Sequence, residues 1–209
     1  MKKLLITIII ITLFTSCESK QARKEREARE QKVSIELEQR QREEAILSKQ
    51  ARIEQEKKDE AQRKEQEIYN RYISNSLLTG STPYSKYYGK NSTCPDYGCS
   101  QIKVRTSNSD VLVTIKKNNK VVRHAYIQAG DSYAFSFPNG TYQTFFYYGK
   151  GWNPEKEMKG GAIKGGFVSN EEFGKDQPQS LHHNILEYEL ILQQNGNFST
   201  RPSNPDEAL

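Results

Sequence analysis

The chain has 209 residues and a formal net charge of +5; hydrophobic residues make up 34% of it and charged residues 27%. This length accommodates one ordinary domain and an appendage. The charge is small and evenly mixed in sign, which argues against nucleic acid as a partner.

The first residues have the pattern of a secretory signal. A basic start, Met1-Lys2-Lys3, precedes an apolar run from Leu4 to Phe14, which ends shortly before Cys17. The apolar run has about 11 residues, whereas a helix needs about 20 to cross a bilayer. We therefore expect residues 1–16 to be a removable signal peptide and not a membrane anchor.

The ending Thr15-Ser16-Cys17 resembles the signal of bacterial lipoproteins, and the whole chain is similar to lipoproteins of the Bacteroidota with a charged helical stalk. Phe14 departs from the small aliphatic residue usual at its position. The resemblance implies that Cys17 carries lipid and that the membrane is a partner through this anchor. It also implies an outer-membrane location, facing the periplasm or alternatively the cell surface. The alternative is an ordinary signal peptide with a chance cysteine.

Residues 17–75 have the composition of a long helix. From about Ser19 to Ile73 there is no Gly and no Pro, and strong helix formers dominate. At 1.5 Å per residue such a helix is about 80 Å long. Acidic residues recur four positions before basic ones, which is the favourable order: Glu25–Arg29, Glu36–Arg40, Glu38–Arg42, Glu54–Lys58, Asp59–Arg63 and Glu60–Lys64.

A heptad pattern in this segment is incomplete. A coiled coil needs an apolar seam over consecutive heptads. This pattern favours a solvated single helix over a weak homo-oligomer, and a disordered charged linker is the remaining alternative. One frame places on the seam the apolar Val33, Leu37, Leu47, Ala51, Ala61, Ile68 and Tyr72, and the charged Arg40, Glu44, Glu54, Lys58 and Glu65.

Residues 76–100 read as a linker, with Gly80 and Pro83 as helix breakers. The aromatic run from Pro83 to Gly89 is expected to dock on the following domain. Cys94 and Cys99 enclose four residues, and in an exported protein we expect them to form a disulfide. Free thiols or a metal site are the alternatives.

Residues 101–198 alternate with period two and predict an antiparallel β-sandwich of about seven strands. Residues 199–209, polar and interrupted by Pro, predict a flexible tail. The expected strands are Gln101–Thr106, Val111–Lys117, Val121–Ile127, Ser132–Phe137, Thr141–Tyr148, Gly161–Val168 and Asn184–Gln193. The expected inward residues are Ile102, Val104, Leu112, Thr114, Val122, Ala125, Ile127, Phe135, Tyr142, Phe146, Phe167, Ile185, Tyr188, Leu190 and Leu192.

The segment 120–148 contains a Gly130-Asp131 turn and the motif Pro138-Asn-Gly-Thr-Tyr142 between strands. It is similar to part of a transthyretin-like or carboxypeptidase-regulatory-like sandwich. The resemblance implies a binding or spacer module without catalysis, and no ligand site carries over.

An enzyme is not expected. The chain contains no nucleophile elbow, phosphate-binding glycine loop or metalloprotease motif. His182 and His183 are adjacent and point to opposite faces of a strand, and His124 lies on another strand, so no metal or cofactor is expected and the histidines are assigned to the surface or to loops.

Aromatic residues give the remaining functional signal. Tyr147, Tyr148 and Trp152 are candidates for a ligand-binding face, because outward rings can stack on sugars or anchor a protein partner. The alternative is that a second sheet or the Pro83–Tyr97 segment covers them. The sequence therefore predicts a non-enzymatic, membrane-anchored envelope lipoprotein whose helical stalk presents a β-sandwich to an envelope protein. The alternatives are a glycan- or peptidoglycan-binding module and a coiled-coil assembly protein.

Overall fold

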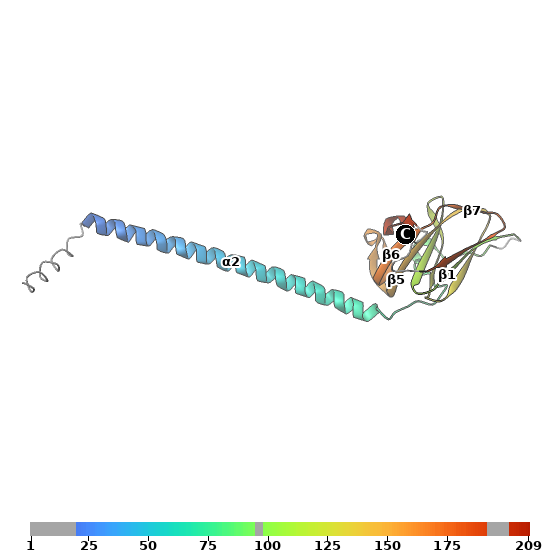
Figure 1. Ribbon diagram of the computed structural model, residues 1–209, viewed down its shortest axis with the longest axis horizontal. Coiled ribbons are helices and arrows are strands. Elements are labelled where there is room, and N and C mark those ends of the chain that lie inside the picture. Colours follow the sequence, from blue (N-terminus) through green and yellow to red (C-terminus); the bar gives the residue numbers. More distant parts are fainter. Residues whose placement is uncertain (1–19, 95–97, 192–200) are drawn as a thin grey trace, which may run out of the picture. The chain divides into compact units, whose positions relative to one another are not determined.

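The computed structural model describes residues 20–94, 98–191 and 201–209, shown in colour in Figure 1. The chain divides into two compact units, Met1–Gln62 and Arg63–Leu209. A long helix runs through the first unit and ends in the second. All described strands belong to the second unit.

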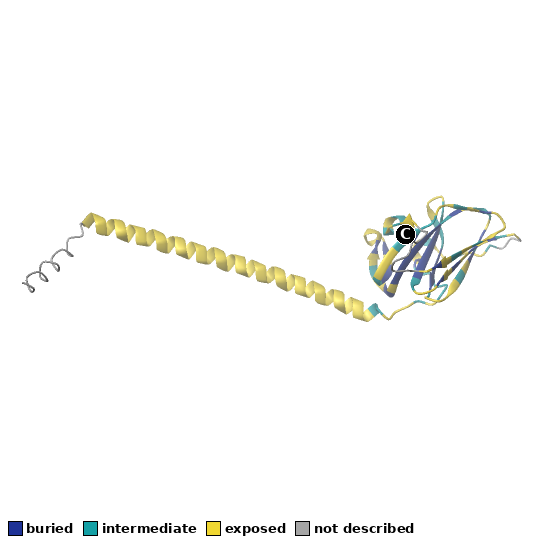
Figure 2. Ribbon diagram, in the orientation of Figure 1, coloured by how far each residue is buried: buried dark blue, intermediate teal, exposed yellow. Residues whose placement is uncertain are grey.

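The helix α2 spans Lys20–Tyr72, 53 residues, and none of them is buried (Figure 2). This confirms the predicted helix and contradicts the alternative of a disordered linker. The predicted acid-first pairs Glu36–Arg40 and Glu54–Lys58 are both formed at 2.7 Å. The helix ends a few residues before the expected boundary at residue 75, because the next residues bind the β-domain instead.

Two sheets form the β-domain, which confirms the sandwich. The smaller sheet has the order β4-β1-β8, and the larger has the order β3-β2-β5-β6-β9, with β7 paired to the start of β5. The strands are β1 (Ser100–Thr106), β2 (Asp110–Lys117), β3 (Lys120–Ile127), β4 (Ser132–Phe137), β5 (Gly140–Met158), β6 (Ile163–Lys175), β7 (Gln179–Leu181), β8 (Ile185–Leu190) and β9 (Arg201–Pro202). Three short helices, α3 (Ser85–Tyr88), η1 (Lys159–Gly161) and α4 (Pro205–Ala208), complete the described elements.

Three features of the sheets go beyond the sequence prediction. β5 continues to Met158, ten residues past its expected end, and pairs with β6 as a long hairpin. β8 runs parallel to β1, with Gln101 opposite Ile185, whereas the other strand pairs are antiparallel. β7 and β9 were not predicted.

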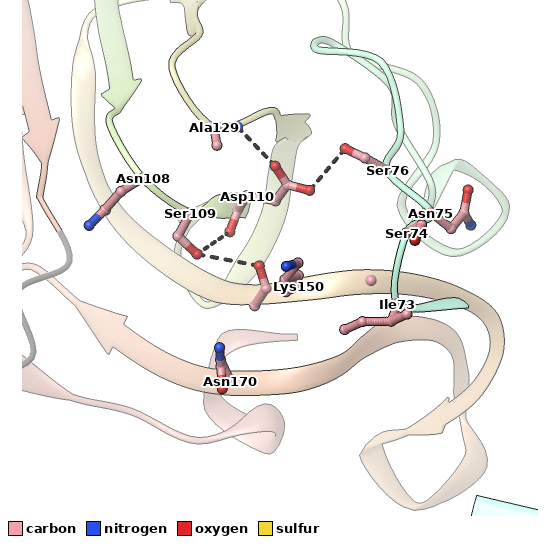
Figure 3. Close-up of a pocket in the computed structure, with 12 residues that line it drawn as sticks. Ile73, Ser74, Asn75, Ser76, Asn108, Ser109, Asp110, Ala129, Lys150 and Asn170 are labelled. Atoms are coloured by element: carbon pink, nitrogen blue, oxygen red, sulfur yellow. Dashed lines mark hydrogen bonds between the residues drawn. The ribbon is translucent and has the colours of Figure 1, made fainter. Parts of the chain in front are cut away.

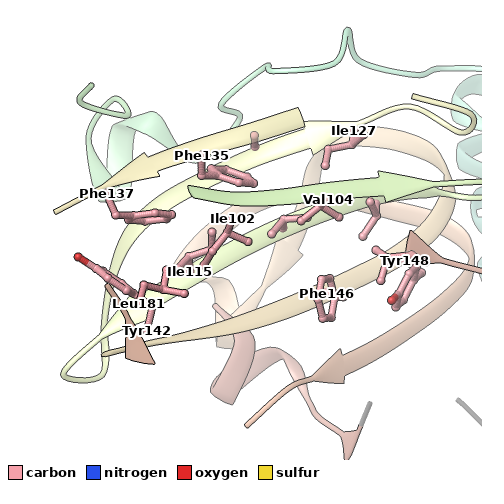
Figure 4. Packing of buried hydrophobic residues seen from close by; sticks show 14 residues of the cluster. Ile102, Val104, Ile115, Ile127, Phe135, Phe137, Tyr142, Phe146, Tyr148 and Leu181 are labelled. Carbon is pink, nitrogen blue, oxygen red and sulfur yellow. The ribbon is translucent and has the colours of Figure 1, made fainter. Parts of the chain in front are cut away.

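Both faces of the large sheet are covered. Figure 4 shows the first core, which fills the space between the two sheets and includes Ile102, Phe135 and Phe146. The second core lies on the other face of the large sheet, where Tyr84 from the linker and Leu209 pack on Tyr126, Trp152 and Phe167. Because side chains alternate along a strand, β2 supplies both cores.

The linker also occupies the outer edge of β3. Gly80 N donates to Tyr126 O and Tyr126 N donates to Ser81 O, both at 2.8 Å. The Asn91 side chain accepts from His124 N at 3.0 Å and donates to His124 O at 2.8 Å. An edge strand exposes unpaired backbone groups that invite aggregation, and here the linker satisfies several of them. The predicted docking of the aromatic linker is confirmed, since Tyr84 is fully buried.

The expected flexible tail is wrong for residues 201–209. Pro205 begins α4, and the Asn204 side chain accepts from Glu207 N at 2.9 Å, which is a helix cap. Ala208 and Leu209 are then buried against the second core. The polar sequence suggested a loose segment, but its two apolar residues complete the cover of the large sheet.

Most of the expected inward residues are buried. Ile185 is an exception at 59% exposed, because it lies on the outer face of β8. Val122 and Tyr188 are partly buried and pack against the first core. Leu192 lies outside the described residues.

Candidate functional site at the joint of helix and β-domain

The last turns of α2 and the residues after them, all in the second unit, attach directly to β5. Asn75 O accepts from Trp152 N at 2.8 Å, and Asn75 Nδ2 donates to Trp152 O at 2.5 Å. At Gly151, with φ of +75°, an added Cβ would lie 2.7 Å from both Ile73 Cα and Tyr72 O. The backbone approach at this joint therefore requires glycine.

A groove of about 590 Å³ lies on one side of the joint. Its apolar part includes Ile68 and Tyr69, which are 44% and 39% exposed. Within the described chain, neither Glu65 nor Arg71 has an ion-pair partner, so the groove presents apolar surface beside free charges of both signs. It is lined by Glu65, Ile68, Tyr69, Arg71, Tyr72, Asn153, Glu155, Lys156, Glu157 and Val168.

A network of polar groups fixes Lys156 at the groove wall. Its Nζ donates to Phe167 O at 2.6 Å and contacts a carboxylate oxygen of Glu171. The other oxygen of Glu171 accepts from Tyr147 OH, which itself accepts from Phe167 N at 2.8 Å. Burial, together with the hydrogen bond to Glu171, raises the pKa of Tyr147 far above its usual range. The phenol therefore stays protonated and acts as a structural donor.

A second, polar hollow of about 320 Å³ is lined by the residues that follow the helix, Ile73 to Ser76, and by turns of the β-domain (Figure 3). Asp110 Oδ2 accepts from Ser76 Oγ at 2.9 Å and from Tyr126 OH at 2.5 Å, while Oδ1 accepts from Ala129 N at 2.8 Å. Both carboxylate oxygens are thus used to hold the linker and a turn to the sheet. The Ser76 hydroxyl and the Asp110 carboxylate, which meet in this hollow, are thus part of the contact between the linker and the sheet.

The structure buries all three aromatic residues predicted to bind a ligand. Tyr147 and Tyr148 are 1% exposed and Trp152 is 2% exposed. Tyr148 lies in the core between the sheets, and Trp152 lies under Tyr84 with ring centroids 6.1 Å apart. The prediction of an outward aromatic face is wrong, because a layer covers each face to which β5 directs its rings. The alternative, cover by a second sheet and by the linker, is confirmed.

The predicted disulfide between Cys94 and Cys99 is present, with a Cα–Cα distance of 6.2 Å. At the adjacent Gly98, an added Cβ would lie 2.7 Å from Cδ2 of His183, so the disulfide loop packs against the turn before β8. The predicted lipidation residue, Cys17, lies outside the described residues.

The location predicted for the His124 side chain is wrong. It was expected at the surface or in a loop, but it is 1% exposed and packs against the rings of both Tyr84 and Tyr88. Its Nε2 has no hydrogen-bond partner, and burial lowers the pKa of the imidazole. His182 and His183 are exposed in the turn between β7 and β8. Among the described residues, no cluster of His, Cys, Asp and Glu could hold a metal ion.

In residues 20–94, 98–191 and 201–209, no helix is both long and apolar enough to cross a membrane.

The joint therefore has a groove that includes the exposed side chains of Ile68 and Tyr69, and a polar hollow in which Asp110 accepts hydrogen bonds from the linker and the sheet. Comparison of the chain with protein-family models, curated proteins and solved structures finds no match.

Proposed function

We propose that the protein is a non-enzymatic, membrane-anchored envelope lipoprotein in which the helix presents the β-domain to a partner. The observation that carries this proposal is the contrast between the two parts of the chain. The helix has 53 residues without one being buried, whereas the β-domain has two complete hydrophobic cores formed by sheet, linker and residues 208–209. A helix that contributes so little to a core acts as a spacer.

The position of Cys17 supports the anchor. It lies three residues before Lys20, where the helix begins. A lipid at this residue would connect the membrane directly to a spacer of about 80 Å. Two or more acyl chains on one residue exceed what stable membrane attachment requires.

The groove at the joint is the surface we assign to the partner. It combines exposed apolar side chains with charges that have no partner in the described chain. The acid and phenol groups around it, Glu171 and Tyr147, are engaged in bonds that hold β5 to β6. The proposed role is therefore binding and not catalysis.

The anchor is tested by Cys17→Ser, with the double variant Cys94→Ser/Cys99→Ser as the matched control that also removes thiols. We expect Cys17→Ser to move the protein from the membrane fraction to the soluble fraction, while the control stays in the membrane. Retention of Cys17→Ser in the membrane fraction after a high-salt wash would contradict the proposal.

A second candidate function, assembly through the helix, is favoured by the exposed apolar residues along α2. Val33 and Leu47 are 64% exposed and Leu37 is 55% exposed. Light scattering on the lipid-free chain, with and without residues 19–75, tests this function. We expect a dimer only when the helix is present; a monomer in both cases would contradict it.

A further inference from the structure

Charged residues interrupt the exposed apolar residues of α2. Their positions favour an antiparallel over a parallel arrangement if two copies of the helix pair. The heptad seam holds Leu37 and Ile68 near its two ends, 55% and 44% exposed. Between them lie charged seam residues, among them Arg40 and Glu65. An apolar seam drives pairing, and charges on the seam decide register and orientation.

A parallel, in-register pair is disfavoured by these charges. Each seam residue would face its own copy, so that like charges would meet at every charged position. Such contacts are destabilising, because each charge is brought close to another of the same sign. The positions concerned are Arg40, Glu44, Glu54, Lys58 and Glu65.

The antiparallel register that sets Leu37 opposite Ile68 has no like-charge contact on the seam and joins apolar residues near its ends. If Leu37 faces Ile68 of the second copy, Val33 faces Tyr72 and Arg40 faces Glu65. The remaining seam contacts then join a charged residue to an apolar one: Glu44 with Ala61, Leu47 with Lys58, and Ala51 with Glu54. Beside the seam, Glu36 faces Arg71. We propose that the helix pairs with a second copy of this chain in this antiparallel register.

The surface hollows agree with this pairing. A small hollow on α2 is lined by Val33, Glu36, Leu37 and Arg40. The groove at the joint is lined on its helical side by Glu65, Ile68, Tyr69, Arg71 and Tyr72. The register brings the first set of one copy onto the second set of the other, apolar against apolar and acid against base. By two-fold symmetry each copy supplies both surfaces, which makes the interface closed.

This inference rests on the second candidate function, assembly through the helix, and does not need the lipid. In this assembly the second copy, and not an envelope partner, occupies the groove at the joint. It has a consequence for the anchored form, because an antiparallel pair separates the two amino-terminal ends of the helices by on the order of 100 Å. On one membrane, pairing of this kind and an upright helix exclude each other.

Cysteine cross-linking distinguishes the two directions of pairing. The full chain with Cys17→Ser is used. Because Cys94 and Cys99 are joined in a disulfide, each introduced cysteine is then the only free thiol of its chain. Leu37→Cys mixed with a tagged Ile68→Cys should give a mixed disulfide dimer under mild oxidation. Leu37→Cys alone should not cross-link, since its two copies would lie about 45 Å apart. Ile46→Cys, an exposed position off the seam, is the matched control for Leu37→Cys and should not link to Ile68→Cys.

A charge exchange provides an independent measurement. Arg40→Glu should weaken dimerisation several-fold in sedimentation equilibrium, in part because it also removes the ion pair with Glu36 of the same helix. The double variant Arg40→Glu/Glu65→Arg should dimerise more strongly than Arg40→Glu, because the ion pair between the two copies is re-formed with reversed signs. Cross-linking of Leu37→Cys to itself would overturn the antiparallel register while leaving assembly intact. A monomer in every variant, without any cross-link, would overturn assembly as well.

Discussion

Asn75 binds the main chain of Trp152 at two points, through its own carbonyl oxygen and through its side-chain amide. These hydrogen bonds join the chain that leaves the helix to β5, the central strand of the large sheet. Together with the close approach of Ile73 to Gly151, they determine where the helix stops and the linker begins.

Asn75→Ala should lower the free energy of unfolding of the β-domain by about 1–2 kcal/mol, because it removes a partly buried hydrogen bond and leaves Trp152 O without this donor. The measurement is urea unfolding followed by tryptophan fluorescence, which reports on the single Trp152. Asn70→Ala, in the exposed helix, is the control and should change the midpoint little. Equal midpoints for the two variants would show that the joint contributes no stability.

Gly151→Ala should be much more harmful than Gly130→Ala, although both residues have similar positive φ of 75° and 85°. The backbone strain of a side chain in this region costs about 1–2 kcal/mol at either position. Only at Gly151 does the new Cβ also meet backbone atoms at 2.7 Å; at Gly130 nothing lies within 4 Å. We expect a total loss of about 3 kcal/mol or more for Gly151→Ala. Similar thermal midpoints for both variants would contradict the close approach.

Leu209→Ala should destabilise the domain by about 2 kcal/mol or more, the range for a leucine truncated in a core. Leu209 is 2% exposed, whereas Leu78, the control, is 75% exposed. Leu78→Ala should change stability by less than about 0.5 kcal/mol. If the two variants unfold at the same urea concentration, residues 205–209 do not cover the large sheet.

The stability of the domain should fall as the pH is lowered below the ordinary pKa of histidine, about 6.5. Burial lowers the pKa of His124 in the folded state, so the unfolded chain binds the proton more readily and acid favours unfolding. Tyr88, which faces His124, stays neutral in this range because burial raises its pKa to about 12. The contribution of neutral His124 to the free energy of unfolding is complete above pH 6.5. It is lost progressively as the pH falls towards the lower pKa that His124 has in the folded state.

This dependence should disappear in His124→Gln, measured as the urea midpoint at pH 7.5 and pH 5.5, and should persist in His182→Gln, which changes an exposed residue. If the urea midpoint of His124→Gln falls between pH 7.5 and pH 5.5 as much as that of the unchanged chain, the acid sensitivity belongs to other groups.

The sequence predicted those parts of the fold that depend on local pattern. The strands β1 to β4 appear within one residue of their expected limits, because hairpin residues such as Asn118 and Asn119, both with positive φ, mark where each strand turns. The helix likewise follows from composition and from the spacing of its charges.

The parts that sequence reasoning missed depend on contacts between distant segments. The rings of Tyr147 and Trp152 point to the face of the sheet that ordinarily meets solvent in a sandwich. The linker residue Tyr84, together with Ala208 and Leu209, makes that face a core. His124 is buried for the same reason. The one available signal was the aromatic run after Pro83, which is too apolar for a free linker.

The most direct test of the proposed anchor is the intact mass and amino-terminal residue of the native protein extracted from membranes. The account predicts a chain that begins at Cys17 and carries acyl groups on that residue, and that loses this mass in Cys17→Ser. A chain that begins at Met1, or a Cys17 without acyl mass, would contradict it.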